Sequence, residues 1–118
     1  MVALTGELGA GKTTFAQGFA RALGVHGRIV SPTFIIFRHY TLHLTHYTSF
    51  YHVDAYRLQN PRELTAFGFK KILADQKNIV LVEWASKIKK ILLRDTIWIK
   101  FYHGKNESER EMHIATIK

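Results

Sequence analysis

The order of residues 6–13, Gly-Glu-Leu-Gly-Ala-Gly-Lys-Thr, restricts the fold more than any other part of the sequence. It matches the phosphate-binding pattern G-x-x-x-x-G-K-[ST] at every required position. A random chain of this length would match with a probability of about 0.004 at ordinary residue frequencies. An apolar strand predicted over Met1–Thr5 runs into the loop, and a helical pattern runs out of it. The motif therefore predicts an α/β domain that binds a nucleotide.

Each part of this loop has a predicted role at the polyphosphate. Glycines let backbone N–H groups converge on phosphate oxygens, and the helix starting near Gly11 adds unpaired N–H groups and the positive end of its dipole. Lys12 supplies a cation for the β- and γ-phosphates, and Thr13 offers a hydroxyl to Mg²⁺. The residues expected to contact the nucleotide here are Gly6, Glu7, Leu8, Gly9, Ala10, Gly11, Lys12, Thr13 and Thr14.

The composition fits a single domain over residues 1–118, since 47% of the residues are hydrophobic and suffice for one core. The sequence has no cysteine, which excludes disulfides and thiolate metal sites. No apolar run approaches a membrane span and no signal-peptide pattern is present, so we expect a cytoplasmic protein. The net charge of +8 suits RNA as well as a polyanionic nucleotide, and charge alone does not decide between them.

The pattern after the loop predicts a helix and then an extended segment. Apolar residues recur every four positions from Phe15 to Leu23 on a face that should pack on the sheet, and Gly24 is placed as the stop. Residues 28–37 contain a proline that excludes a helix interior. The hydroxyl of Thr33 in this segment either favours a strand or senses the γ-phosphate, and both interpretations stay open.

Residues 37–56 are crowded with Phe, Tyr, Thr, Val and His, which predicts a β-hairpin that turns near residues 45–48. His39, His43 and His46 would share a face only in a helix. We therefore expect packing or surface roles for these histidines rather than a zinc site.

Two carboxylates close predicted strands. Asp54 follows a largely apolar run and is a candidate to hold Mg²⁺ water, with a turn or a salt bridge to Arg57 as the alternative. Glu83 and Trp84 close the continuous apolar run of residues 79–82, which predicts a parallel strand buried on both faces. Ligands of open α/β sheets bind at this strand end. Glu83 is thus placed to orient or deprotonate water or to bind the metal, unless it merely ends the strand.

A short helix should begin after Asn60, whose side chain caps it and which is followed by proline. Leu64 and Phe67 are expected to face inward, and Gly68 to end or bend the helix.

The last third of the chain predicts a basic helix and a hairpin. Lys87, Lys90 and Arg94 fall on one helical face, which is either solvated or a docking surface for tRNA or an acidic partner. Residues 96–102 and 111–117 alternate as two strands joined by a polar turn.

Five blocks then carry a resemblance that covers nearly the whole chain. They are LTGELGAGKTTFAQGFARALG, SPTF, YHVDAYRL, a proline-started REL helix followed by a glycine, and LVEW. In this order and spacing the sequence is similar to the bacterial TsaE family, the small P-loop ATPases of tRNA threonylcarbamoyladenosine (t6A) biosynthesis.

The resemblance implies a P-loop NTPase-like sheet of mixed strands flanked by helices, lacking the family's N-terminal helix and first strand. It implies that Thr13 and Asp54 serve Mg²⁺ and that Thr33 senses the terminal phosphate. Glu83 and Trp84 would lie at the nucleotide, with Glu83 needed for turnover and also a candidate metal ligand. The implied catalytic residues are Lys12, Asp54 and Glu83.

The family also implies ATP or ADP and Mg²⁺ as cofactors, and TsaB- and TsaD-type subunits of the threonylcarbamoyl transferase as partners. Hydrolysis is expected to be weak without them, because no arginine is obviously placed as a finger. Ser86 stands where the family often has an acidic residue, two positions after the LVEW block. The alternatives are a small-molecule kinase and a nucleotide-dependent binding module without turnover.

Overall fold

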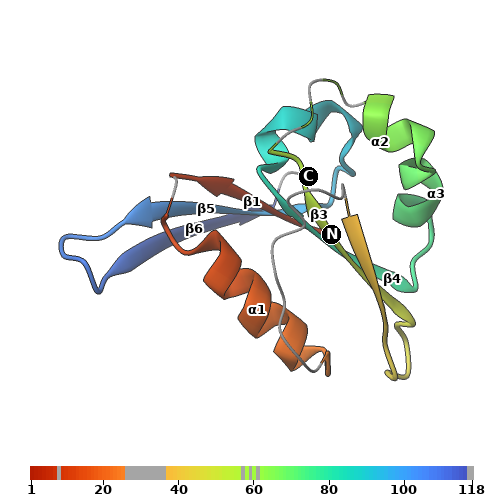
Figure 1. The fold of residues 1–118 in the computed structure, drawn as a ribbon, viewed down its shortest axis with the longest axis horizontal. Helices are drawn as coiled ribbons and strands as arrows, with labels where there is room; N and C mark the ends of the chain where they lie inside the picture. The colour runs from red at the N-terminus through yellow and green to blue at the C-terminus, as the bar shows by residue number, and fades with distance from the viewer. Residues whose placement is uncertain (8, 26–36, 57, 59, 61, 117–118) are drawn as a thin grey trace.

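The computed structural model describes residues 1–7, 9–25, 37–56, 58, 60 and 62–116. They form one mixed six-stranded sheet with the strand order β2-β3-β4-β1-β5-β6 (Figure 1). The strands are β1 (Val2–Gly6), β2 (Phe37–Thr41), β3 (Ser49–Asp54), β4 (Asn78–Glu83), β5 (Ile97–His103) and β6 (Arg110–Thr116). The helices are α1 (Lys12–Ala22), α2 (Arg62–Ala66), α3 (Phe69–Ala74) and the 3₁₀ helix η1 (Ala85–Ile91).

The four central strands run parallel, and the antiparallel strands β2 and β6 form the two edges. Parallel strands end at the same edge of a sheet, where ligands of such sheets bind. The register places Asp54 beside Glu83, Glu83 beside Leu4, and Gly6 beside Phe101. The phosphate loop and both predicted carboxylates therefore share one edge.

Helices cover both faces of the sheet, with α1 on one side and α2 and α3 on the other (Figure 1). The side chains of Phe50 and Leu81 pack under α1, where Phe19 lies 5.8 Å from Phe50 between ring centroids. The opposite face buries Val53, Val82 and other apolar residues beneath α2, α3 and η1. Successive side chains of β3 and β4 therefore pack into two separate cores, one on each face of the sheet.

Several predicted elements are confirmed. The strand, loop and helix at the N-terminus form as expected, and the left-handed Gly24 (φ 86°) follows the end of α1. Both hairpins form, the first with residues 42–48 between its strands. The Asn60 side chain accepts a hydrogen bond from the Arg62 N–H at 3.0 Å, and Gly68 (φ 79°) separates α2 from α3.

Two sequence predictions are wrong. Phe67 is 60% exposed and meets Phe37 edge-on at 6.4 Å instead of facing inward. The basic helix predicted for residues 87–94 is a 3₁₀ helix that ends at Ile91, with a kink at Ile88 (φ −124°). The kink seats the fully buried Ile88 against the sheet. Residues 28–36 lie outside the described part of the chain.

Candidate nucleotide-binding site

The loop after β1 has the backbone of an anion-binding nest. Gly6, Gly9 and Gly11 have φ angles of 124°, 73° and 103°, a region that side chains disfavour. The N–H of Phe15 makes a helical bond to Gly11 O at 2.9 Å, so the preceding N–H groups of α1 lack partners within the helix. No side chain of the described residues caps this end. The loop and helix start therefore present N–H donors to an anion.

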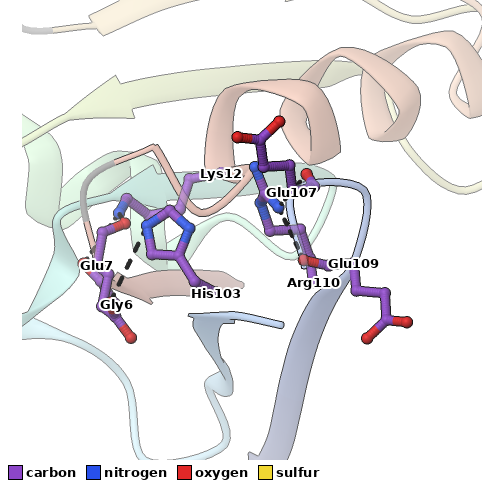
Figure 2. Close-up of polar contacts among 7 residues, drawn as sticks. All are labelled: Gly6, Glu7, Lys12, His103, Glu107, Glu109 and Arg110. Atoms are coloured by element: carbon purple, nitrogen blue, oxygen red, sulfur yellow. Dashed lines mark hydrogen bonds and ion pairs between the residues drawn. The ribbon is translucent and has the colours of Figure 1, made fainter. Parts of the chain in front are cut away.

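Lys12 is held against this loop with only 5% of its surface exposed. Its Nζ donates to Gly6 O at 3.0 Å and to Glu7 O at 2.8 Å, as Figure 2 shows. The ammonium also lies 4.2 Å from the centre of the Trp84 ring. Burial lowers the pKa of Lys12, and the negative charges of Glu83 and Glu7 oppose that shift. The cation is thus positioned by contacts on three sides.

Glu83 lies at the end of β4, and its side chain is 3% exposed. Its Oε1 accepts a hydrogen bond from Thr13 Oγ1 at 3.3 Å, which joins the strand end to the first turn of α1. Asp54 is its register neighbour on β3 and accepts the Tyr56 N–H at 2.9 Å. A hydroxyl and two carboxylates are hard oxygen donors that fit Mg²⁺, which keeps several waters of its own.

Trp84 completes this side of the loop through an uncommon backbone conformation. Its φ of 57° is the single positive value among the described non-glycine residues. The turn brings the indole under Lys12 and to 4.9 Å from the Tyr56 ring. A hollow of about 230 Å³ opens here, and its lining residues are Gly9, Gly11, Lys12, Thr13, Thr14, Glu83 and Trp84. The predicted loop, carboxylate and indole therefore meet, while Leu8 and Thr33 lie outside the described residues.

The β5–β6 hairpin forms the other side of the loop, which sequence reasoning did not anticipate. His103 Nε2 lies 4.0 Å from Glu7 Oε2, and Arg110 Nη1 donates to Glu107 O and Glu109 O at 2.8 and 2.7 Å (Figure 2). A second hollow of about 440 Å³ separates hairpin and loop, lined by Gly9, Ala10, Gly11, Thr14, Phe15, Phe101, Glu107, Ser108, Arg110 and Met112. An arginine therefore stands beside the loop, and only the hairpin register brings it there.

A second missed residue is His52, whose Nε2 lies 2.5 Å from Glu83 Oε2 in the buried part of the site. The signal for it was present in the sequence, because His52 precedes Asp54 by two positions on a predicted strand. Residues two apart on a strand share a face.

The predicted basic face does not form as one helical surface. Lys87 Nζ donates to Tyr56 O and lies 5.1 Å over the Tyr56 ring, while Arg94 lies beyond the end of η1. All three side chains, Lys90 included, are exposed. The kinked 3₁₀ helix changes the spacing that would have aligned the three side chains.

Among the three histidines weighed as zinc ligands, His39 has the predicted packing and surface contacts. His39 stacks on Tyr51 at 4.6 Å and bonds to Ser49 Oγ at 2.9 Å, which is a packing and surface role. Within the described ranges no three His, Asp or Glu side chains gather as a metal cluster.

The loop geometry, the parallel strand ends and the flanking helices define a P-loop NTPase-like α/β fold. The family model described as "Threonylcarbamoyl adenosine biosynthesis protein TsaE" matches residues 1–112, and the chain belongs to this family.

Relatives support the assignment over the whole chain. The Bacillus subtilis tRNA threonylcarbamoyladenosine biosynthesis protein TsaE is 34% identical over 99% of this chain and 70% of its own length. The Haemophilus influenzae protein of the same name is 38% identical over 78% of this chain. The crystal structure of Bacillus subtilis YdiB superposes with a TM-score of 0.75 at 34% identity, covering 99% of this chain and 68% of that one.

The matched region spans 56% of the length of the Haemophilus influenzae relative. In the part of the chain that the structure describes, none of the helices is long and apolar enough to cross a membrane.

Proposed function

We propose that the chain binds and hydrolyses MgATP as an accessory subunit of the machinery that forms t6A in tRNA. The observation that carries this proposal is the buried Glu83 carboxylate, 3.3 Å from Thr13 Oγ1 and beside Lys12 at the loop. A nest that only held phosphate would not require a carboxylate buried against it, since burying a charge is costly. The names of the relatives supply the t6A setting.

Some residues of the site bind the nucleotide and the metal ion, and Glu83 takes part in the hydrolysis itself. The nest and Lys12 hold the β- and γ-phosphates, and Thr13 and Asp54 are the residues that would hold Mg²⁺, with Glu83 as a further candidate ligand. Bound Mg²⁺ neutralises charge on the phosphate oxygens. Glu83 orients the attacking water and accepts its proton. The water oxygen bonds to the γ-phosphorus while the bond to the β,γ-bridging oxygen breaks, which releases ADP and phosphate.

The hollow between loop and hairpin suits the nucleoside end of the ligand. Phe15, Phe101 and Met112 give it an apolar wall, and Ser108 and Arg110 give it a polar rim. We propose adenine over guanine, because the sequence has no convincing guanine-reading N-K-x-D pattern. A competition titration in which GTP binds better than ATP would reverse that choice.

The proposed partners are TsaB- and TsaD-type transferase subunits, in the cytoplasm where tRNA is modified. A γ-phosphate contacted by Thr33 would favour one docked state, and hydrolysis would release it. Arg110 lines the hollow beside Gly9 and Gly11, and its Cγ lies 3.9 Å from where a Cβ on Gly11 would stand, so stimulation by partners would act on a site that already has an arginine beside the loop. Direct tRNA contact through the exposed side chains of Lys87, Lys90 and Arg94 remains a separate proposal.

The test is ATP hydrolysis by the purified chain with Mg²⁺ and with a chelator, alone and with the transferase subunits and tRNA. We expect slow Mg²⁺-dependent release of phosphate that the partners accelerate. Binding to the subunits is measured in parallel with ATP, a non-hydrolysable analogue, ADP and no nucleotide. Intact ATP under every condition would identify a binding module, and phosphate transferred to a small molecule in an acceptor screen would identify a kinase. Equal subunit binding in all four states would refute the proposal that the γ-phosphate favours one docked state.

A further inference from the structure

His52 is the most deeply buried polar side chain at the site, with none of its surface exposed. It lies in the middle of β3, and its Nε2 contacts Glu83 Oε2 at 2.5 Å. The other oxygen of the same carboxylate, Oε1, accepts the Thr13 hydroxyl at 3.3 Å. The Glu83 carboxylate is thus held between a core strand on one side and the phosphate loop helix on the other.

The surroundings fix the imidazole as well. The ring of His52 is stacked parallel to that of Phe50 at 6.4 Å, and Leu81 is its register partner on β4. Its Nδ1 is buried and has no hydrogen-bond partner among the described residues. An imidazole with one satisfied and one unsatisfied nitrogen fills a core less well than an apolar side chain would. The single contact with Glu83 therefore accounts for a polar residue here.

We infer that His52 is a positioning residue for the hydrolysis reaction: its Nε2–H holds Glu83 Oε2, so that Oε1 stays turned toward Thr13 and the attacking water. This inference rests on the proposed ATPase function. A glutamate side chain has three rotatable bonds, and a carboxylate held at one oxygen loses most of that freedom. His52 contacts Glu83 in the described structure and lies outside the lining of the phosphate hollow, so it acts through the carboxylate.

The test compares turnover with affinity in variants of the full chain. ATP affinity is followed by Trp84 fluorescence in a Trp98→Phe background, and turnover by phosphate release. We expect His52→Leu to lose at least tenfold in turnover while its dissociation constant for ATP changes less than threefold. His52→Gln keeps an N–H donor and should recover part of the loss. His113→Leu, in the exposed His113–Glu111 pair, is the matched control and should leave both quantities unchanged.

A double-mutant cycle separates positioning from general support of the fold. In a Glu83→Gln background, His52→Leu should cause no further loss of turnover. Two results would overturn the inference and leave the proposed ATPase function intact. In the first, the double variant loses turnover by the product of the two single losses; in the second, His52→Leu has normal turnover. A wild-type chain that never hydrolyses ATP, with or without partners, would refute the proposed function and this inference together. Thermal unfolding checks each variant, and His52→Met replaces His52→Leu in the cycle if the leucine variant does not fold.

Discussion

Two histidine–glutamate pairs in this fold have similar contacts and opposite surroundings. In the first, His52 lies 2.5 Å from Glu83, and the side chains are 0% and 3% exposed. In the second, His113 lies 3.0 Å from Glu111 on the edge strand β6, and the side chains are 60% and 64% exposed. Water screens the exposed pair, which is worth about 0–1 kcal/mol, whereas leaving a buried polar group without its hydrogen-bond partner costs about 1–3 kcal/mol. Burial rather than contact distance decides which pair can hold a catalytic group in place.

A similar contrast between crowded and open surroundings separates two glycines, Gly6 and Gly18, in the expected effect of an alanine substitution on stability. A Cβ on Gly6 would lie 2.2 Å from Phe101 O, at a φ of 124°. We expect Gly6→Ala to lower the free energy of unfolding by about 3 kcal/mol or more. Gly18 is inside α1 with nothing within 4 Å of the added carbon. Gly18→Ala should therefore raise the free energy of unfolding by about 0.5–1 kcal/mol. Urea denaturation of both variants measures the difference, and equal effects would contradict the packing at Phe101.

The carboxylates of the two pairs should differ in function. Glu83→Gln should keep nucleotide affinity but reduce ATP hydrolysis at least about 100-fold, which corresponds to about 2.7 kcal/mol, because the amide cannot accept the proton of water. Glu111→Gln, the exposed counterpart, should hydrolyse ATP at the wild-type rate. Phosphate release at saturating MgATP measures both. Normal turnover in Glu83→Gln would leave that carboxylate a purely structural role.

Two lysines over aromatic rings extend the comparison to binding. Lys12 lies 4.2 Å from the Trp84 ring centre and is buried, while Lys100 lies 5.3 Å from that of Tyr102 and is exposed. Lys12→Met should weaken MgATP binding at least tenfold, about 1.4 kcal/mol, because the nest loses its cation. Lys100→Met should bind like the wild type. Calorimetric titration distinguishes them, and unchanged affinity in Lys12→Met would contradict the assignment of the phosphate loop.

The smallest predicted effect is a pH dependence that follows from the lowered pKa of Lys12. Between this pKa and the ordinary value of 10.5, the unfolded chain binds more protons at Lys12 than the folded chain does, so this residue's contribution to stability rises with pH. ATP affinity changes in the opposite direction, since the neutral amine attracts phosphate less. Titrations from about pH 7 to about pH 10 should show falling affinity in the wild type and a flatter profile in Lys12→Met. Identical profiles would exclude Lys12 as the titrating group.

The sequence was sufficient wherever one local pattern determined the structure. The loop was recognisable from its glycines, and the apolar run before Glu83 predicted a buried parallel strand that β4 confirms. Prediction from the sequence failed where tertiary contacts overrode the local pattern. The spacing of residues 87–94 suited an α-helix, but the left-handed Trp84 and the kink at Ile88 produced a 3₁₀ helix.

The missed residues depend on pairing between strands. Arg110 reaches the loop only through the register of β5 with β6, in which His103 pairs with Arg110. His52 reaches Glu83 only because β3 and β4 lie side by side, with Asp54 opposite Glu83. Neither register can be obtained from spacing along one chain. A polar residue two positions before a candidate metal ligand is the sequence signal that would have pointed to His52.

If ATP places its phosphates in the hollow where Lys12 and Trp84 meet, the fluorescence of Trp84 changes on binding. The measurement is a titration of MgATP into the Trp98→Phe chain, in which Trp84 is the one remaining indole. We predict a saturable change in emission whose midpoint equals the dissociation constant from equilibrium dialysis and moves at least tenfold in Lys12→Met. An emission spectrum that stays constant while dialysis shows ATP bound would place the nucleotide away from Trp84 and contradict this binding site.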